Sequence, residues 1–349
     1  MVNKSPRELF EVPAEWSITQ IMAGLANALD GTGPALAFAP SNFSEVDPEI
    51  AVVIPTSGST GTPKEVALTA AALRASATAA HKYIKAEPGQ HWSLLLPTNH
   101  IAGVNVLVRA LMLGTELVAS NFDFTSIVPT QLYRAVHDDV QLLNSLKNAE
   151  AVLVGGAAIS PELLADAGSA DINVVTTYGM SEMCGGCIYN NEPLSGVEVE
   201  VRANGRIALR GPMQAKNYLG ISSPLADSEN WFLTSDAGYL VAEKLFVTGR
   251  IDDQIISGGE KISLGTLDAY LNSEYTIEFM SCAIPSLEWG QSLCLAASSS
   301  FDIAEIKEKL RRNFGHQVVP KLFLENIELP HTSLGKPDRT KLASKFEIM

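Results

Sequence analysis

The chain has 349 residues with 25 Lys or Arg and 39 Asp or Glu, so its formal net charge at pH 7 is −14. Hydrophobic residues make up 46% and charged residues 18%, which excludes a largely disordered chain. The acidic balance argues against a nucleic-acid-binding surface, which needs a basic field. The sequence shows no signal-peptide core, no membrane-spanning apolar run and only four cysteines. We therefore expect a cytoplasmic protein without membrane insertion.

The first half of the chain predicts an α/β sheet domain, because apolar helices alternate with short buried strands up to about Pro193. Helical patterns cover residues 18–29, 68–83, 101–113 and 132–146, and a further helix begins at Ser160-Pro161-Glu162. Strand patterns cover residues 51–55, 92–96, 117–119, 151–154 and 173–176.

The pattern changes after Pro193 and predicts a smaller β subdomain with strands over 197–201, 206–209 and 244–247. Residues beyond 253 predict an α+β domain, with helices over 264–271 and 302–314 and strands over 279–284 and 292–297. A length of 349 also favours two domains, since one core rarely exceeds about 250–300 residues. We expect a large N-terminal α/β domain, with its β subdomain, over 1–251. A small mobile α+β C-terminal domain would span 252–349.

The sharpest local signal is the run Thr-Ser-Gly-Ser-Thr-Gly-Thr-Pro-Lys at residues 56–64. Small residues allow the backbone to approach a polyanion, hydroxyl and N–H groups bind phosphate oxygens, and a lysine balances charge. The run is not a Walker A loop, because Gly61 is followed by Thr-Pro-Lys-Glu rather than Lys-Ser/Thr. Its composition alone also fits a flexible surface loop.

Five motifs in order across residues 56–336 resemble those of the acyl-adenylate-forming superfamily, which includes acyl-CoA synthetases, peptide-synthetase adenylation domains and luciferases. They are the loop at 56–64, Tyr178-Gly179-Met180-Ser181-Glu182, Thr234-Ser235-Asp236, Gly249-Arg250-Ile251-Asp252-Asp253 with residues 255–262, and Leu334-Gly335-Lys336. The chain departs from the family at Ser181, where Thr is usual, and at Ser235, where Gly is usual. Neither change removes a charged group.

The resemblance implies a site for ATP and Mg²⁺. Ser57, Ser59, Thr60 and Lys64 would hold the β- and γ-phosphates, and Gly155, Gly156 and Ala157 would form the adenine wall. Tyr178 would stack on the base, within an ATP-binding run that includes Thr177, Gly179, Met180 and Ser181. Glu182 would hold Mg²⁺, and Asp236 would accept hydrogen bonds from the ribose hydroxyls beside Arg250. Taken singly, each charged residue also fits a solvated surface position.

The resemblance also implies two catalytic poses. In the family the small domain swings about the residue that is here Asp252. One pose would present Lys336 to the α-phosphate and the attacking carboxylate, where a cation stabilises the transition state. The other would present the face at 258–261 to the thiol, so Lys261 joins Lys336 and Glu182 as a catalytic candidate. The alternative for Asp252-Asp253 is an ordinary turn.

Segments 96–103, 153–159 and 177–197, with Arg109, resemble the o-succinylbenzoate–CoA ligases of menaquinone biosynthesis. The implied reaction joins o-succinylbenzoate to ATP as an acyl-adenylate, and CoA then displaces AMP. Arg109 is the candidate partner of the second carboxylate, through a charge-assisted or water-bridged contact. His100 and Gly185 are further candidates for substrate binding. A surface arginine and a packed histidine are the alternatives.

Other interpretations stay open. Cys184-x-x-Cys187 fits small residues of the acyl pocket better than a zinc half-site, which lacks a convincing second pair. The chain could instead be another aryl- or fatty-acyl–CoA ligase, a carrier-protein-loading adenylation enzyme, or a nucleotide-binding regulatory protein that has lost catalysis. The sequence leaves the oligomeric state open, a homodimer included.

Overall fold

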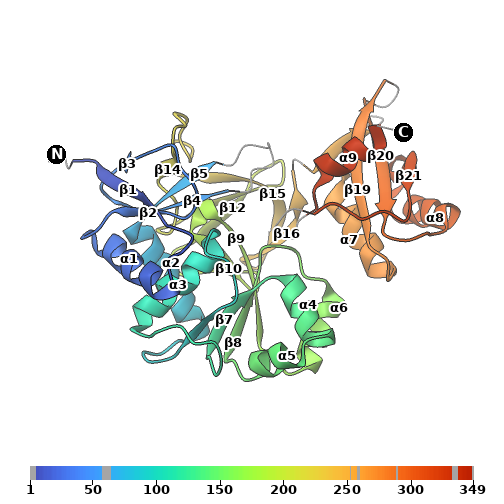
Figure 1. The fold of residues 1–349 in the computed structure, drawn as a ribbon. Coiled ribbons are helices and arrows are strands. Elements are labelled where there is room, and N and C mark those ends of the chain that lie inside the picture. Colours follow the sequence, from blue (N-terminus) through green and yellow to red (C-terminus); the bar gives the residue numbers. More distant parts are fainter. Residues whose placement is uncertain are drawn as a thin grey trace. The chain divides into compact units, whose positions relative to one another are not determined.

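The computed structural model describes residues 5–56, 64–251, 253–257, 260–287, 290–331 and 337–347 (Figure 1). The chain divides into two compact units. Unit 1 comprises residues 1–200, 208–233 and 241–245, and unit 2 comprises 201–207, 234–240 and 246–349. Asp252 lies outside the described residues, so the boundary and hinge assigned to it remain predictions.

Unit 1 contains two six-stranded sheets. The first has the order β14-β5-β4-β2-β1-β3, with β1 Arg7–Glu11, β2 Ala35–Ala37, β3 Glu45–Val46, β4 Ile50–Pro55, β5 Glu65–Thr69 and β14 Asn217–Tyr218. The second has the order β11-β10-β9-β8-β7-β6, with β6 Trp92–Leu94, β7 Phe124–Ile127, β8 Ala151–Val154, β9 Val174–Met180, β10 Gly185–Tyr189 and β11 Glu192–Pro193. Strands β6 to β9 are parallel, and β8 is buried throughout, as expected where helices cover both faces.

Helices cover the second sheet on two sides (Figure 1). Helices α1 (Ile18–Asp30), α2 (Ala70–Ile84) and α3 (Ile101–Leu113) lie between the sheets: α1 contacts β2 and β4, α2 contacts β5 and β10, and α3 contacts β7 and β10. Helices α4 (Pro129–His137), α5 (Val140–Lys147) and α6 (Pro161–Ser169) pack on the other side through a shared apolar core. A capping box at Ser17 begins α1, and the Ser160 side chain caps α6.

The division between the units runs through a four-stranded sheet of order β12-β13-β15-β16. Its strands are β12 Glu198–Val201, β13 Arg206–Arg210, β15 Phe232–Val241 and β16 Lys244–Arg250. Unit 2 has its own sheet, β18-β17-β20-β19 with β21 beside β20. These strands are β17 Gln254–Ser257, β18 Glu260–Ser263, β19 Phe279–Ser286, β20 Gly290–Ala297 and β21 Leu322–Leu324.

Alternation along β19 and β20 gives unit 2 two apolar cores, because successive strand residues point to opposite faces. Phe279, Leu293 and Leu295 pack with α7 (Leu264–Glu274) and α8 (Ile303–Phe314). Met280, Cys282 and Cys294 pack with α9 (Arg339–Glu347). The expected α/β class, with an α+β C-terminal part, is confirmed. Among the helices of the described residues, none has the length and apolarity needed to cross a membrane.

The helix predicted over 68–83 is confirmed as α2, with a later start. Strand β5 runs to Thr69, whose side chain accepts the Ala72 N–H and starts α2 at Ala70. Two other predicted elements are wrong. The pattern at 132–146 forms two helices, because Asp139 caps a second one by accepting the Leu142 N–H. Residues 117–119 form no strand; their one bond to the sheet in the described chain is from Val118 N–H to the Trp92 carbonyl, at 3.1 Å.

Candidate active site

The ends of the predicted phosphate loop are held together by strand pairing. Strand β4 pairs antiparallel with β5, so Pro55 lies opposite Glu65. The Thr56 N–H donates to the Lys64 carbonyl at 2.8 Å, and the Lys64 N–H donates to Thr56 Oγ1 at 3.3 Å. Ser57, Ser59 and Thr60 lie outside the described residues. Lys64 is therefore placed at the base of the loop with an exposed side chain.

The predicted adenine wall and the Tyr178 run lie side by side. The last residue of β8, Val154, pairs with Thr176 of the parallel strand β9, so the residues after each face one another. Gly155 follows β8 and packs so closely on β9 that an added Cβ would lie 2.1 Å from Thr177 Oγ1. Thr177 Oγ1 in turn donates to the Val154 carbonyl at 3.3 Å. Gly155 thus meets Thr177 directly, and Tyr178 is half-buried on the next position of β9. A larger residue at Gly155 would push the two strand ends apart.

Glu182 lies on the 3₁₀ turn Ser181–Met183 that follows Met180 of β9. Its carbonyl accepts the Ala215 N–H at 2.8 Å, and its Oε1 accepts the Tyr218 hydroxyl at 2.7 Å. Lys64 Nζ lies 4.9 Å from the centroid of the same Tyr218 ring. The structure therefore brings Lys64 and Glu182 together around Tyr218. Burial and the neighbouring carboxylate raise the pKa of Tyr218, so the phenol is a protonated donor.

Tyr218 is absent from the sequence-predicted site. It belongs to a two-residue strand, which has no periodicity and no local motif. Its partners are 36 and 154 positions earlier in the chain, so only the tertiary structure places it there.

Arg109 is buried on α3 with only 3% of its surface exposed, so the surface-arginine alternative is wrong. Its Nη2 donates to the Tyr189 hydroxyl at 2.9 Å and its Nη1 to Ser126 Oγ at 3.4 Å. The guanidinium carbon lies 5.1 Å from the centroid of the Trp92 ring. Nε is buried, and no group in the described part of the chain accepts its hydrogen. Burial, with the Arg109 charge, lowers the pKa of His81 to about 4, so its imidazole is neutral at pH 7. Among the described residues, Arg109 is thus a buried cation whose acceptors are uncharged hydroxyls.

The other substrate-binding candidates, His100 and Gly185, both lie beside the N-terminal part of α3. His100 is half-buried at the N-cap of α3. Gly185 begins β10 in a left-handed conformation (φ +89°), and an added Cβ would lie 2.4 Å from Asn105 Nδ2. Asn105, a buried residue of α3 missed by the sequence analysis, donates to the Cys184 carbonyl at 2.7 Å. An amide in an apolar helix is a usable sequence signal, because such a group needs a partner.

Unit 2 holds the remaining described candidates. Asp236 on β15 and Arg250 at the end of β16 lie together, with Arg250 Nη1 3.8 Å from Asp236 Oδ1. Lys261 lies on β18 opposite Ile256, but its side chain is not among those described. Lys336 and Asp252 lie outside the described residues. The predicted pairing of Asp236 with Arg250 is present, and the roles of all the predicted site residues remain proposals.

The cysteines do not form a metal site in the described part of the chain. Cys184 and Cys187 are fully buried, and burial raises the pKa of the Cys187 thiol to about 12. Cys282 and Cys294 face each other across β19 and β20 in unit 2. No group of three or more His, Cys, Asp or Glu residues within the described ranges could hold a metal ion by itself.

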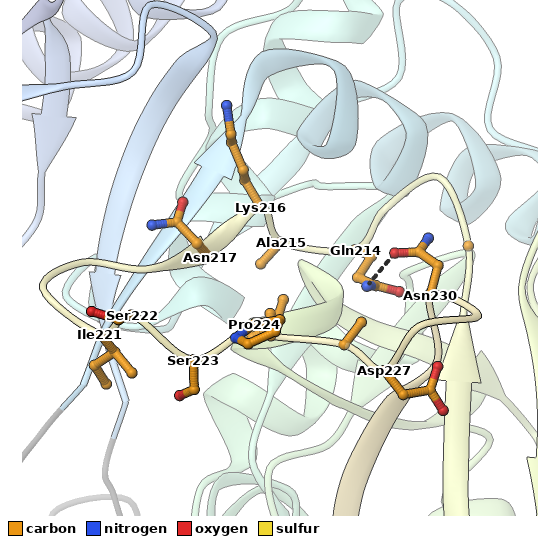
Figure 2. Close-up of a pocket in the computed structure, with 13 residues that line it drawn as sticks. Gln214, Ala215, Lys216, Asn217, Ile221, Ser222, Ser223, Pro224, Asp227 and Asn230 are labelled. Carbon is orange, nitrogen blue, oxygen red and sulfur yellow. Dashed lines mark hydrogen bonds between the residues drawn. The ribbon is translucent and has the colours of Figure 1, made fainter.

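One cavity of about 520 Å³ lies beside β14 in unit 1 (Figure 2). It is an open pocket lined by residues between 211 and 230, where Gln214 Nε2 donates to Asn230 Oδ1 at 3.4 Å. Lys216 extends away from the Ser222–Ser223 loop (Figure 2) and pairs with Asp47 at 2.9 Å. Its lining contains none of the residues that the sequence predicts for the site, so this cavity is distinct from the Lys64–Tyr218–Glu182 group.

Known proteins similar to this chain agree with the motifs. A Mycobacterium tuberculosis protein named "Probable 2-succinylbenzoate–CoA ligase" is 35% identical over 378 residues, which cover 96% of this chain and 97% of that protein. A Lactococcus lactis "2-succinylbenzoate–CoA ligase" is 29% identical and covers 85% of this chain and 71% of its own length. The structure of E. coli MenE with a bound analogue of OSB-AMS has a TM-score of 0.74 at 23% identity, covering 97% of this chain and 82% of that one.

The similarity to E. coli MenE, at 23% identity, shows the fold. The family of this chain is shown by its sequence. The family described as "AMP-binding enzyme" matches residues 11–219, which include the phosphate loop, the Tyr178 run and Tyr218. The chain therefore belongs to the AMP-binding enzyme family, the acyl-adenylate-forming enzymes.

Proposed function

We propose that the chain is an acid–CoA ligase that converts o-succinylbenzoate, ATP and CoA into o-succinylbenzoyl-CoA, AMP and pyrophosphate, as a step in menaquinone biosynthesis. The carrying observation is the 35% identity over 97% of the length of a relative with that named activity. The four cysteines are free, which fits a reducing compartment and supports a cytoplasmic enzyme.

The described residues support the first half-reaction. The succinyl carboxylate attacks the α-phosphorus of ATP, and pyrophosphate leaves. Lys64 lies at the base of the phosphate loop, where its charge can balance the β- and γ-phosphates. Lys336 would stabilise the charge at the α-phosphate. In the second half-reaction the CoA thiol displaces AMP, and Lys261 would face that step after the domain swings about Asp252.

Glu182 fits a magnesium ion that arrives with ATP. Magnesium keeps several waters and is held by one or two carboxylates together with substrate phosphates. A single half-buried carboxylate next to the phosphate loop matches that need, and a dedicated cage of several acidic residues is absent from the described chain. When bound, the ion would neutralise phosphate charge, and Glu182 would hold it in place.

The proposed function is tested by mass spectrometry of the products from enzyme, MgATP, CoA and o-succinylbenzoate. The proposal requires a thioester and AMP. Product from benzoate or a fatty acid but not from o-succinylbenzoate would keep the adenylating class and reject the acid. Thioester that forms only with a carrier protein would reject CoA as the acceptor, and absence of AMP with every acid would indicate a chain without catalysis.

We also propose Arg109 as the partner of the ring carboxylate, and expect Arg109→Lys to raise the KM for o-succinylbenzoate about tenfold. Lysine keeps the charge but has no planar fork, so a single ammonium group cannot bond to Tyr189 and Ser126 and also donate two aligned hydrogen bonds to the ring carboxylate. The KM for 4-oxo-4-phenylbutanoate, which lacks the ring carboxylate, should not change. Initial rates with both acids measure this.

The matched control is Arg134→Lys, at an exposed arginine of α4. It should leave both KM values as in the wild type. If Arg109→Lys raises the KM for both acids equally, Arg109 acts by packing against Trp92 and Tyr189, and the ring carboxylate has another partner.

A further inference from the structure

Strand β14 and the two residues before it connect β5, the strand that follows the phosphate loop, to the turn that carries Glu182. Asn217 and Tyr218 pair antiparallel with Ala67 and Val66 of β5. The Lys216 N–H donates to the Ala67 carbonyl at 3.0 Å, and the Leu219 N–H donates to the Glu65 carbonyl at 2.9 Å. On the other side, the Ala215 N–H donates to the Glu182 carbonyl at 2.8 Å. The segment 215–219 therefore fixes two parts of the site that are more than 100 residues apart in sequence.

The Tyr218 side chain makes the same connection with functional groups. Its hydroxyl donates to Glu182 Oε1 at 2.7 Å, and its ring face lies 4.9 Å from Lys64 Nζ. A neutral phenol orients a carboxylate without cancelling its charge, so the carboxylate can still attract a cation. A ring face attracts an ammonium group while leaving its N–H donors for other acceptors. Both groups are thus oriented but not neutralised.

We propose that Tyr218 is a positioning residue that holds Glu182 for the metal–nucleotide complex and Lys64 for the nucleotide phosphates. This inference rests on the proposed function only in taking ATP with a divalent ion as the ligand. Partners that orient a metal ligand typically change metal affinity 10- to 100-fold when they are removed. Tyr218 itself would contact neither reactant, because it acts through Glu182 and Lys64.

The test is nucleotide binding without acid or CoA, measured by calorimetry with ATP plus Mg²⁺ and with ATP in EDTA. Tyr218→Phe removes the hydroxyl and keeps the ring, so the Kd for MgATP should rise about 10- to 100-fold while the Kd in EDTA stays unchanged. Tyr218→Leu removes the ring as well and should also weaken binding in EDTA. Tyr133→Phe, at an exposed tyrosine of α4, is the matched control and should bind as the wild type does.

A double-variant cycle separates positioning from general structural damage. In the Glu182→Gln background, Tyr218→Phe should cause no further loss of MgATP binding. The inference is overturned if Tyr218→Phe weakens ATP binding equally with and without Mg²⁺, or if it leaves binding unchanged. It is also overturned if the losses of Tyr218→Phe and Glu182→Gln are additive, or if the wild type binds ATP equally well with and without Mg²⁺. Loss of o-succinylbenzoate turnover is a separate result, because no acid is present in these binding measurements.

Discussion

Lys336→Ala should slow acyl-adenylate formation about 100- to 1000-fold, the usual cost of removing one donor that stabilises transition-state charge. Two anions, the α-phosphate and the acid carboxylate, meet at that step, so an unbalanced site faces direct repulsion. CoA attack on a supplied acyl-adenylate should continue at a rate near that of the wild type, because that step would use the other pose of the small domain. Pyrophosphate release and thioester formation from synthetic adenylate measure the two steps separately.

The matched control is Lys341→Ala, at an exposed lysine of α9. It removes the same charge from the same unit and should leave both steps unchanged. Equal losses of both steps in Lys336→Ala would contradict the two-pose mechanism and the hinge assigned to Asp252. A selective loss of the thiol step would instead exchange the proposed roles of Lys336 and Lys261.

Elements with local signals are predictable from this sequence. Helix α3 begins at Ile101 and ends at Leu113, as its apolar run predicts, because Gly114 adopts the left-handed conformation that ends it. Strand β8 also has its predicted bounds, since a short apolar run between helices is typical of a buried parallel strand. Ser160 and Pro161 likewise fix the start of α6 by local chemistry.

Contacts made across the chain are not predictable in the same way. The sequence suggests that Arg109 needs a partner, but Tyr189 lies 80 residues later, and only the arrangement of α3 and β10 brings them together. Tyr218 gives no local signal at all, although it joins two predicted site residues. The start of α2 is not predictable for the same reason: the apolar pattern at Leu68 suits both a strand and a helix, and pairing with β4 places Leu68 in β5.

The ion pair of Arg339 with Asp268 in unit 2 is likewise not predictable from the sequence, and we expect it to stabilise this unit. Arg339 Nη1 donates to Asp268 Oδ2 at 2.6 Å and to the Ser281 carbonyl at 2.5 Å. Asp268 Oδ1 accepts the Ser281 N–H at 2.7 Å, and Arg339 Nε lies 3.5 Å from Asp253 Oδ2. Burial outweighs the Arg339 charge and raises the pKa of Asp268 to about 6, so the carboxylate is still ionised at pH 7.

Arg339→Met should therefore lower the free energy of opening of unit 2 by about 3–5 kcal/mol, the typical result of leaving one member of a buried pair alone. Arg311→Met, which breaks the exposed pair with Glu308, should cost less than about 1 kcal/mol and is the matched control. Hydrogen exchange of the β19 peptide 279–286 measures this locally, which avoids assuming two-state unfolding of a two-unit chain.

The double variant Arg339→Met with Asp268→Leu should recover most of the lost free energy, because replacing both members of a buried pair by apolar groups is often nearly neutral. A double variant as unstable as the single one would mean that the loss comes from the Ser281 backbone, whose carbonyl and N–H both bond to the pair. An Arg339→Met protein with wild-type exchange in β19 would show that the pair adds no stability. Arg339 would then matter only for its contact with Asp253, one residue beyond the proposed hinge.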